Sequence, residues 1–102
     1  MIGHVVMWKF EEQYDGRSKA EHLAQLAQDF KELAPQIEGL VSMEFGVGTG
    51  EGAAAYDAVL VTKFVSREAL AAYDVHPEHQ KIRAHIRAFA ADRRVVDYEA
   101  EA

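Results

Sequence analysis

A tyrosine and two histidines, all able to transfer or donate protons, lie close together at Tyr73, His76 and His79. A histidine imidazole can act as a general base near neutral pH, and a tyrosine hydroxyl can donate a hydrogen bond to an oxygen that becomes negative. Pro77 lies between the two histidines and is typical of the first position of a helix. The same pattern also fits a helix boundary at which His76 is the cap and His79 is simply packed. The rest of the chain must distinguish these two interpretations.

The composition indicates one folded domain over residues 1–102 and excludes several kinds of site. Apolar residues make up 49% and charged residues 27%, as in ordinary globular proteins. The net charge of -6 argues against a nucleic-acid partner, which requires a basic surface. The absence of cysteine excludes disulfides, thiolate nucleophiles and cysteine-bound zinc. The spacing of His76 and His79 is compatible with metal ligation, but no third ligand is evident, so we expect neither a metal nor a cofactor.

No stretch of the sequence resembles a membrane span or a targeting segment. A transmembrane helix needs about 20 consecutive, mostly apolar residues, and no run of this chain approaches that length. The first residues lead directly into a strand-like alternation, without a basic flank followed by an apolar stretch. We therefore expect a cytoplasmic protein with no membrane partner.

Hydrophobic periodicity predicts four strands and three helices. Apolar residues alternate along the strands, which we expect at residues 2–10, 40–47, 56–64 and 95–98. Ser18 and Glu21 have the spacing of a capping box at the start of the longest helix, which should end near Pro35. Two shorter helices are expected to begin at Ser66 and at Pro77.

This order of elements is typical of an α+β fold of the ferredoxin-like type, a four-stranded antiparallel sheet with helices on one face. Large apolar residues also alternate onto the opposite face, which the helices would leave uncovered. A contiguous apolar patch of that size exceeds what a soluble monomer usually exposes. We therefore expect a homodimer, a dimeric α/β barrel in which two sheets pack through these faces.

Periodicity also predicts which candidate residues face the interior. Tyr73 lies on the inward face of its helix, and His79 lies on the inward stripe of the next helix. The residues that we expect to bind substrate beside this pair are His4, Val6, Trp8 and His76. Residues 11–17 are predicted to form a loop. His22 and His85 lie beside the apolar stripes of their helices, and we expect both at the surface.

Five stretches along the chain carry a family resemblance. They are His4-Val5-Val6-Met7-Trp8-Lys9-Phe10, Ile37-Glu38-Gly39-Leu40, the strand from Tyr56 to Phe64, Ala72-Tyr73 followed by His76-Pro77-Glu78-His79, and Val95-Val96-Asp97-Tyr98. Together they resemble the stress-responsive α/β-barrel family, called Dabb. The resemblance implies a dimeric barrel, in agreement with the expected apolar sheet face.

The resemblance also implies a cofactor-free chemistry. One member, the plant olivetolic acid cyclase, closes a linear polyketide by aldol condensation. Its catalytic tyrosine and histidine match Tyr73 and His79, and a pocket histidine on its first strand matches His4. A further pocket histidine of that enzyme falls near Ala58 in this chain. This departure leaves the substrate open.

Our leading hypothesis is a homodimer with an apolar pocket for a small hydrophobic carbonyl or phenolic molecule. In its enzymatic version, a cyclase-like or lyase reaction uses His79 as base and Tyr73 as donor. A second hypothesis is a non-catalytic, stress-associated dimeric binding module. A third is a cofactor-independent monooxygenase. The sequence does not decide whether the protein is an enzyme.

Overall fold

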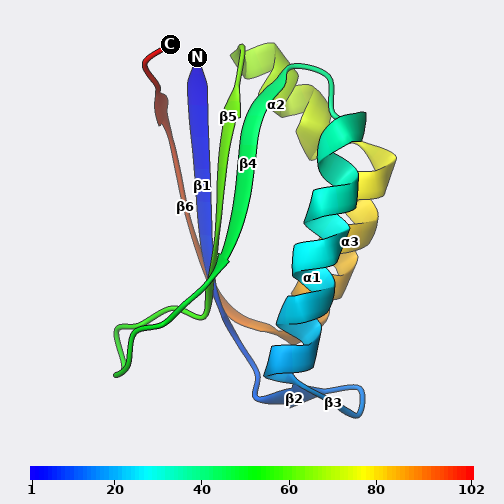
Figure 1. Cartoon of the computed structure of the whole chain (residues 1–102), viewed down its shortest axis with the longest axis vertical. Coiled ribbons are helices and arrows are strands. Elements are labelled where there is room, and N and C mark those ends of the chain that lie inside the picture. The colour runs from blue at the N-terminus through cyan, green and yellow to red at the C-terminus, as the bar shows by residue number, and fades with distance from the viewer.

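Four long strands form one antiparallel sheet in the order β4-β5-β1-β6, in a computed structural model that describes residues 1–102 (Figure 1). The strands of this sheet are β1 (Ile2–Phe10), β4 (Leu40–Val47), β5 (Ala58–Phe64) and β6 (Ala90–Glu99). A separate short hairpin is formed by β2 (Gln13–Tyr14) and β3 (Arg17–Ser18). The helices are α1 (Lys19–Leu33), the 3-10 helix η1 (Ala34–Gln36), α2 (Arg67–Asp74) and α3 (Pro77–Phe89). This is the predicted ferredoxin-like fold.

The capping box predicted at Ser18 and Glu21 starts α1. The Ser18 hydroxyl accepts a hydrogen bond from the Glu21 backbone N–H at 3.2 Å, and the Glu21 carboxylate accepts one from the Ser18 N–H at 3.2 Å. The helix ends at Leu33, and η1 carries the chain across Pro35, as the proline predicts. None of the helices is both long enough and apolar enough to cross a membrane.

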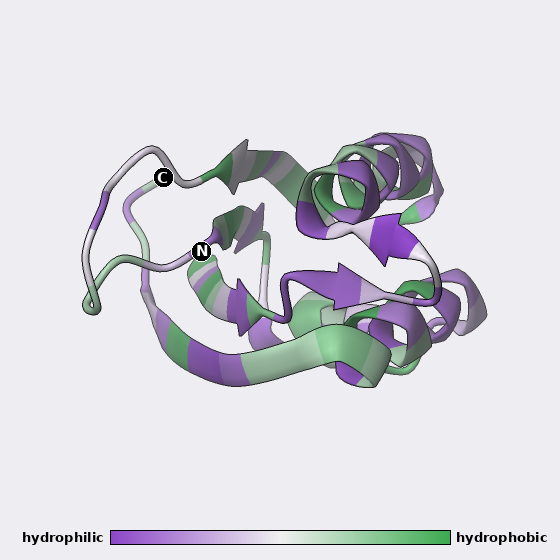
Figure 2. Ribbon diagram, turned by 90° about the horizontal axis from the view of Figure 1, so that it is seen from below, coloured by the Kyte–Doolittle hydropathy of each residue, from purple (hydrophilic) through white to green (hydrophobic).

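The core lies between the sheet and the helices, with α1 and α3 together on one side of the sheet (Figure 1). The buried apolar residues are Val6, Trp8, Phe10, Leu23, Leu26, Phe30, Leu33, Ile37, Ala58, Leu60, Phe64, Tyr73, Ile82, Ile86 and Phe89. Figure 2 shows hydrophobic and hydrophilic bands alternating along the ribbons. The strands β1 and β5 and the helices therefore bury one face and expose the other, whereas β4 and β6 contain no fully buried residue.

The opposite face of the sheet has no covering element. The strand registers place Val5 beside Val61 of β5 and Val96 of β6, so one apolar row crosses three strands. In the next row, Met7 lies between Val59 and Arg94. Val61 is 37% exposed and Val96 is 55% exposed. We call this surface the open sheet face, and it has the apolar character that the sequence predicts.

Two predicted strand starts and one predicted loop were wrong. β6 begins at Ala90 rather than at residue 95, because it pairs with β1 from Phe10 to Ile2 and this ladder extends it through polar residues. The third long strand begins at Ala58, two residues later than predicted. Residues 11–17 contain part of the β2–β3 hairpin rather than a loop alone. Asp15 and Gly16 have φ angles of 52° and 77°, which the tight hairpin turn requires.

The prediction that His22 and His85 lie solvated at the surface was also wrong. His22 is 3% exposed, because the β2–β3 hairpin and α3 cover it. Its Nε2–H donates to the carbonyl oxygen of Tyr14 at 2.6 Å, and its Nδ1 accepts from Nε2–H of His85 at 2.9 Å. The ring of Phe89 packs against both imidazoles, with centroids 4.7 Å and 5.3 Å away. These two histidines form a hydrogen-bonded pair outside the candidate site, in which His22 is buried and His85 is half-buried.

Candidate functional site

A small cavity lies between the core face of the sheet and the helices. Its volume is about 140 Å³, which is below the range of about 300–1,000 Å³ that is common for pockets of drug-sized ligands. The residues that line it are His4, Val6, Trp8, Phe30, Leu60, Tyr73, Asp74, His79, Arg83, Ile86, Arg87 and Arg93. Five of the predicted site residues therefore meet at one cavity. The sixth, His76, is not in its lining.

Tyr73 and His79 lie in direct contact at the junction of α2 and α3. Their rings stack with centroids 4.0 Å apart and planes 20° apart. Nδ1–H of His79 donates to the carbonyl oxygens of Tyr73, at 3.0 Å, and of Asp74, at 3.3 Å. Because Nδ1 carries the hydrogen, Nε2 of the neutral ring is left with a lone pair. The side-chain hydroxyl of Tyr73 has no hydrogen-bond partner in the chain.

Burial sets the protonation of this pair. Desolvation lowers the pKa of His79 below its usual value of 6.5, and the nearby charge of Arg83 lowers it further, whereas the bonds to the two carbonyl oxygens oppose this shift. Desolvation raises the pKa of the Tyr73 hydroxyl well above its usual range. At neutral pH the imidazole is therefore a neutral base and the phenol a protonated donor. Burial is the largest cause of the lowered pKa of His79.

His4 is oriented by a carboxylate on the neighbouring strand. The register of β1 and β6 places His4 opposite Asp97, and Nδ1 of His4 hydrogen-bonds the Asp97 carboxylate. This bond assigns the hydrogen to Nδ1 and leaves Nε2 as an acceptor. Asp97 was not among the predicted site residues. Its alternation with Val95 along the last strand places these two residues on one face, and the register with β1 makes this the face of His4.

Trp8 and Val6 form part of the cavity wall from β1. Trp8 is 4% exposed, and its indole stacks near Phe10 and Phe30. The indole Nε1–H is the one buried side-chain polar group of the chain that has no hydrogen-bond partner. Buried donors of this kind are rare in folded proteins, because leaving one unpaired costs about 1–3 kcal/mol. The indole ring of Trp8 is thus part of the cavity wall, whereas its N–H is enclosed in the core.

Three arginines that the sequence argument did not select also line the cavity. Arg83 pairs with Asp74 at 3.0 Å, whereas the side chains of Arg87 and Arg93 have no partner in the chain. A signal for two of them was present, because His79, Arg83 and Arg87 follow one another at intervals of four residues and so share one helix face. Arg93 lies opposite Trp8 in the sheet register, on the same face as His4.

His76 has the capping role that was its alternative interpretation. Its Nδ1 accepts a hydrogen bond from the backbone N–H of Glu78 at 3.1 Å, which fixes the start of α3 at Pro77. The side chain is directed to the helix end, and the cavity lining does not include it. The sequence places His76 correctly at the helix boundary, and the geometry gives no contact through which it would bind a ligand in this cavity.

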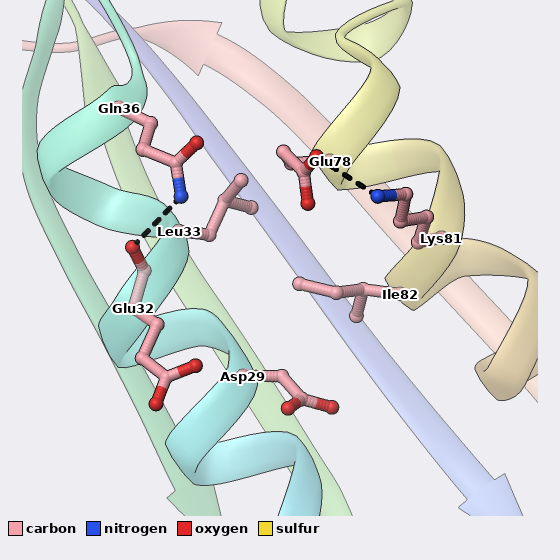
Figure 3. Close-up of a pocket in the computed structure, with 7 residues that line it drawn as sticks. All are labelled: Asp29, Glu32, Leu33, Gln36, Glu78, Lys81 and Ile82. Carbon is pink, nitrogen blue, oxygen red and sulfur yellow. Dashed lines mark hydrogen bonds and ion pairs between the residues drawn. The ribbon is translucent and has the colours of Figure 1, made fainter.

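A second hollow, about 220 Å³ in volume, lies between α1 and α3 (Figure 3). Its side chains interact with each other, since Lys81 pairs with Glu78 at 3.0 Å and the Gln36 amide donates to the Glu32 carbonyl at 3.3 Å. The lining contains no histidine or tyrosine, and no group of three or more metal-ligating side chains occurs in the protein. The smaller cavity is therefore the candidate site.

Solved structures with the same fold come from bacteria and a plant. A dimeric ferredoxin-like protein of unknown function from Jannaschia sp. CCS1 is 27% identical, with 97% of this chain and 98% of that chain covered and a TM-score of 0.78. A second such dimeric protein, from Thermobifida fusca YX, is 24% identical over 97% and 90%, with a TM-score of 0.84. A hydroxynitrile lyase from Passiflora edulis is 15% identical over 95% and 90%, with a TM-score of 0.79. The last two likenesses show the fold alone.

The family assignment rests on the sequence of the whole domain. No curated protein matches the chain. The sequence model of the Dabb family, described as the stress responsive A/B barrel domain, matches residues 2–100. The match spans every strand of the sheet and the three helices that contribute to the cavity lining, and it confirms the resemblance seen in the sequence. The chain therefore belongs to the Dabb family.

Proposed function

We propose that the cavity binds a small hydrophobic molecule with carbonyl or phenolic oxygens. In this proposal His79 removes a proton from the molecule, and Tyr73 stabilises the negative charge that forms on its oxygen. The observation that supports this most strongly is the hydrogen bonding of His79. Two backbone carbonyls hold its Nδ1–H and leave the Nε2 lone pair available as a base, next to the unpartnered hydroxyl of Tyr73. A base and a donor in one apolar cavity are the groups that enolate chemistry requires.

In a cofactor-free aldol cyclisation, Nε2 of His79 takes a proton from the carbon next to a carbonyl. The electron pair of that C–H bond forms an enolate, and its oxygen accepts a hydrogen bond from the Tyr73 hydroxyl. The enolate carbon then bonds to a second carbonyl carbon, whose oxygen takes the proton back from Nε2. Neither an oxidant nor a reductant enters this balance. His4, held by Asp97, is left with an acceptor nitrogen for a ligand hydroxyl.

The non-catalytic binding module uses the same cavity without proton transfer. One observation favours it: the stack on Tyr73 and the two carbonyl bonds already hold His79 as firmly as a structural residue. A lyase reaction with the same base is compatible with the fold of the Passiflora edulis enzyme, but at 15% identity this is an analogy of fold. No cavity residue favours the cofactor-independent monooxygenase over these two.

We also propose that the protein is a homodimer that pairs its open sheet faces. The apolar row of Val5, Val61 and Val96 supports this, since no helix of the same chain covers it. The Jannaschia and Thermobifida proteins are described as dimeric, which is consistent with the proposal. Because the cavity lies on the other face of the sheet, each subunit would keep its own site.

Deuterium exchange separates the enzyme from the binding module. Acetophenone is a small aromatic ketone whose methyl protons exchange slowly without a catalyst, and NMR in deuterated buffer measures their loss. The wild-type protein should accelerate the exchange, His79→Gln should abolish the acceleration, and Tyr73→Phe should reduce it by at least about 100-fold, as is typical for loss of an oxyanion donor.

His76→Asn is the matched control, because asparagine keeps the helix cap and His76 lies outside the cavity. Its exchange rate should equal that of the wild type. Acetophenone that binds in the cavity without any acceleration of exchange would favour the binding module. Exchange that persists in His79→Gln would refute the assignment of the base.

A further inference from the structure

Two positively charged side chains border the cavity without a partner. Arg87 in the last turn of α3 and Arg93 in β6 both contribute to the cavity lining, and both are exposed. They therefore lie where the cavity meets solvent. Neither guanidinium has a hydrogen bond or an ion pair within the chain, whereas the third arginine of the lining, Arg83, pairs with Asp74 at 3.0 Å.

The carboxylates near the cavity are already engaged. Asp74 pairs with Arg83, and Asp97 holds His4. The protein as a whole has a net charge of -6. The two unpaired arginines make the opening of the cavity a positively charged region of this negatively charged protein. The charge of Arg93 also acts on the interior of the cavity. It lowers the pKa of the Tyr73 hydroxyl, whereas burial has the larger effect and raises that pKa. The opening of the cavity therefore attracts a negative group.

The cavity wall contributes one further donor. The hydroxyl of Tyr73, which lines the cavity, has no hydrogen-bond partner in the chain. The lining thus combines one neutral donor in the interior with two cationic donors at the opening, while its one carboxylate is paired. Such a lining suits a ligand whose oxygens accept hydrogen bonds at both ends.

We propose that the ligand of this cavity carries a carboxylate, which Arg87 and Arg93 bind at the opening, while a carbonyl or phenolic oxygen at its other end reaches the Tyr73 hydroxyl. This inference rests on the proposed function, because it specifies the substrate class of the same site. Arginine is well suited to the role, since its planar guanidinium can give two parallel hydrogen bonds to a carboxylate.

A phosphate ester fits the geometry less well. Phosphate groups are bound by arginine and, in many sites, also by backbone N–H groups at the start of a helix. At the start of α3, Pro77 has no N–H and the N–H of Glu78 is bonded to His76. Neither residue lines the cavity. The two guanidinium groups are therefore the anion-binding groups of this site.

Arg87 has another interaction that must be separated from ligand binding. It lies in the last turn of α3, where a cation is stabilised by the helix dipole. Arg93 lies on a strand and has no such interaction. The two arginines are therefore tested one at a time, and the stability of each variant is measured together with its affinity.

The test compares 4-hydroxybenzoate with 4-hydroxybenzamide, which has nearly the same shape but no charge. Trp8 is the only tryptophan, so its single indole N–H cross-peak in a ¹H–¹⁵N NMR spectrum reports occupancy of the cavity. The wild-type protein should bind the benzoate at least about tenfold more tightly, the effect expected for a charge-assisted hydrogen bond. Added salt should reduce this preference.

Arg87→Gln and Arg93→Gln should each weaken benzoate binding by about tenfold and leave benzamide binding unchanged. Arg17→Gln is the matched control, because Arg17 is exposed, pairs with Glu21 and lies outside the cavity. It should bind both probes as the wild type does. Equal affinities of the wild type for the two probes would overturn the carboxylate assignment alone. Failure of both probes to shift the Trp8 signal at millimolar concentration would overturn it together with the proposed function.

Discussion

The imidazole of His79 stacks on the phenol ring of Tyr73 and also hydrogen-bonds the Tyr73 carbonyl oxygen at 3.0 Å. The stack and the hydrogen bond join α3 to the end of α2, and neither uses the Tyr73 hydroxyl. The structural contribution of Tyr73 is therefore separable from its chemical one, because the ring supports the fold and the hydroxyl remains free. This separation makes a sharp mutational test possible.

Tyr73→Phe should leave the free energy of unfolding within about 0.5 kcal/mol of the wild type, because the hydroxyl has no partner to lose. Urea unfolding monitored by circular dichroism measures this. His79→Ala should destabilise the protein by about 1–3 kcal/mol, since it loses the stack and the bonds to two backbone carbonyls. Equal destabilisation by the two substitutions would show that the Tyr73 hydroxyl is structural, contrary to its proposed role.

The pH dependence of ketone exchange should follow His79. Its pKa is lowered from 6.5 by burial, so the base remains neutral and active at pH 7 and above. The exchange rate should therefore be flat near neutrality and fall only below pH 6.5. The rate profile between mildly acidic and neutral pH measures this. A midpoint above 6.5 would mean that His79 gains a stabilising negative partner when the ligand binds.

The pair of His22 and His85 should make the fold sensitive to acid. Burial lowers the pKa of His85 from 6.5, and the neighbouring His22 lowers it further, so the unfolded chain binds protons more readily than the folded protein does. The stability due to this difference is fully present above pH 6.5 and is lost as the pH falls below that value toward the folded pKa. Urea unfolding of the wild type and of His85→Gln over this pH range should give a shallower dependence for the variant. Parallel curves would exclude His85 as a cause.

The open sheet face should control the oligomeric state. Met7→Glu places a charge in the centre of this face, and the neighbouring Arg94 can pair with it, so the monomer should still fold. Val75→Glu adds the same charge at a residue that is 69% exposed in the α2–α3 connection, outside the sheet. Sedimentation equilibrium should show a dimer for the wild type and for Val75→Glu, and a monomer for Met7→Glu. A wild-type monomer at micromolar concentration would remove the basis of the dimer proposal.

The fold was predictable from the sequence wherever apolar residues alternate along a strand. β1 and β4 were predicted with their observed bounds in this way, although β1 buries one side and β4 is at most half-buried. β6 was predicted too short because it is an edge strand. Its first residues are held by pairing with β1, which local periodicity does not record. The pair Asp15-Gly16 is a strong hairpin signal, and reading it as such would have identified β2 and β3.

The candidate site was predictable in part, since five of its six predicted residues line the cavity and His76 does not. The missed residues, Asp97 and the arginines, act through neighbours in space. His4 and Asp97 are brought together only by the strand register, and Arg93 is brought to Trp8 in the same way. His22 was misplaced for a related reason, because the segment that buries it is the hairpin that the sequence argument read as a loop.

The helix α3 passes into β6 without an intervening residue, since Phe89 ends one and Ala90 begins the other. As a result, nearly all the polar groups of the cavity come from one unbroken stretch of chain, from Tyr73 to Asp97, while β1, α1 and β5 provide mainly its apolar wall. The polar part and the apolar part of the cavity lining can thus change in sequence independently of each other. Replacing this stretch with that of another family member would exchange the charged and hydrogen-bonding side chains of the cavity together, while the open sheet face would keep the valines of β1 and β5.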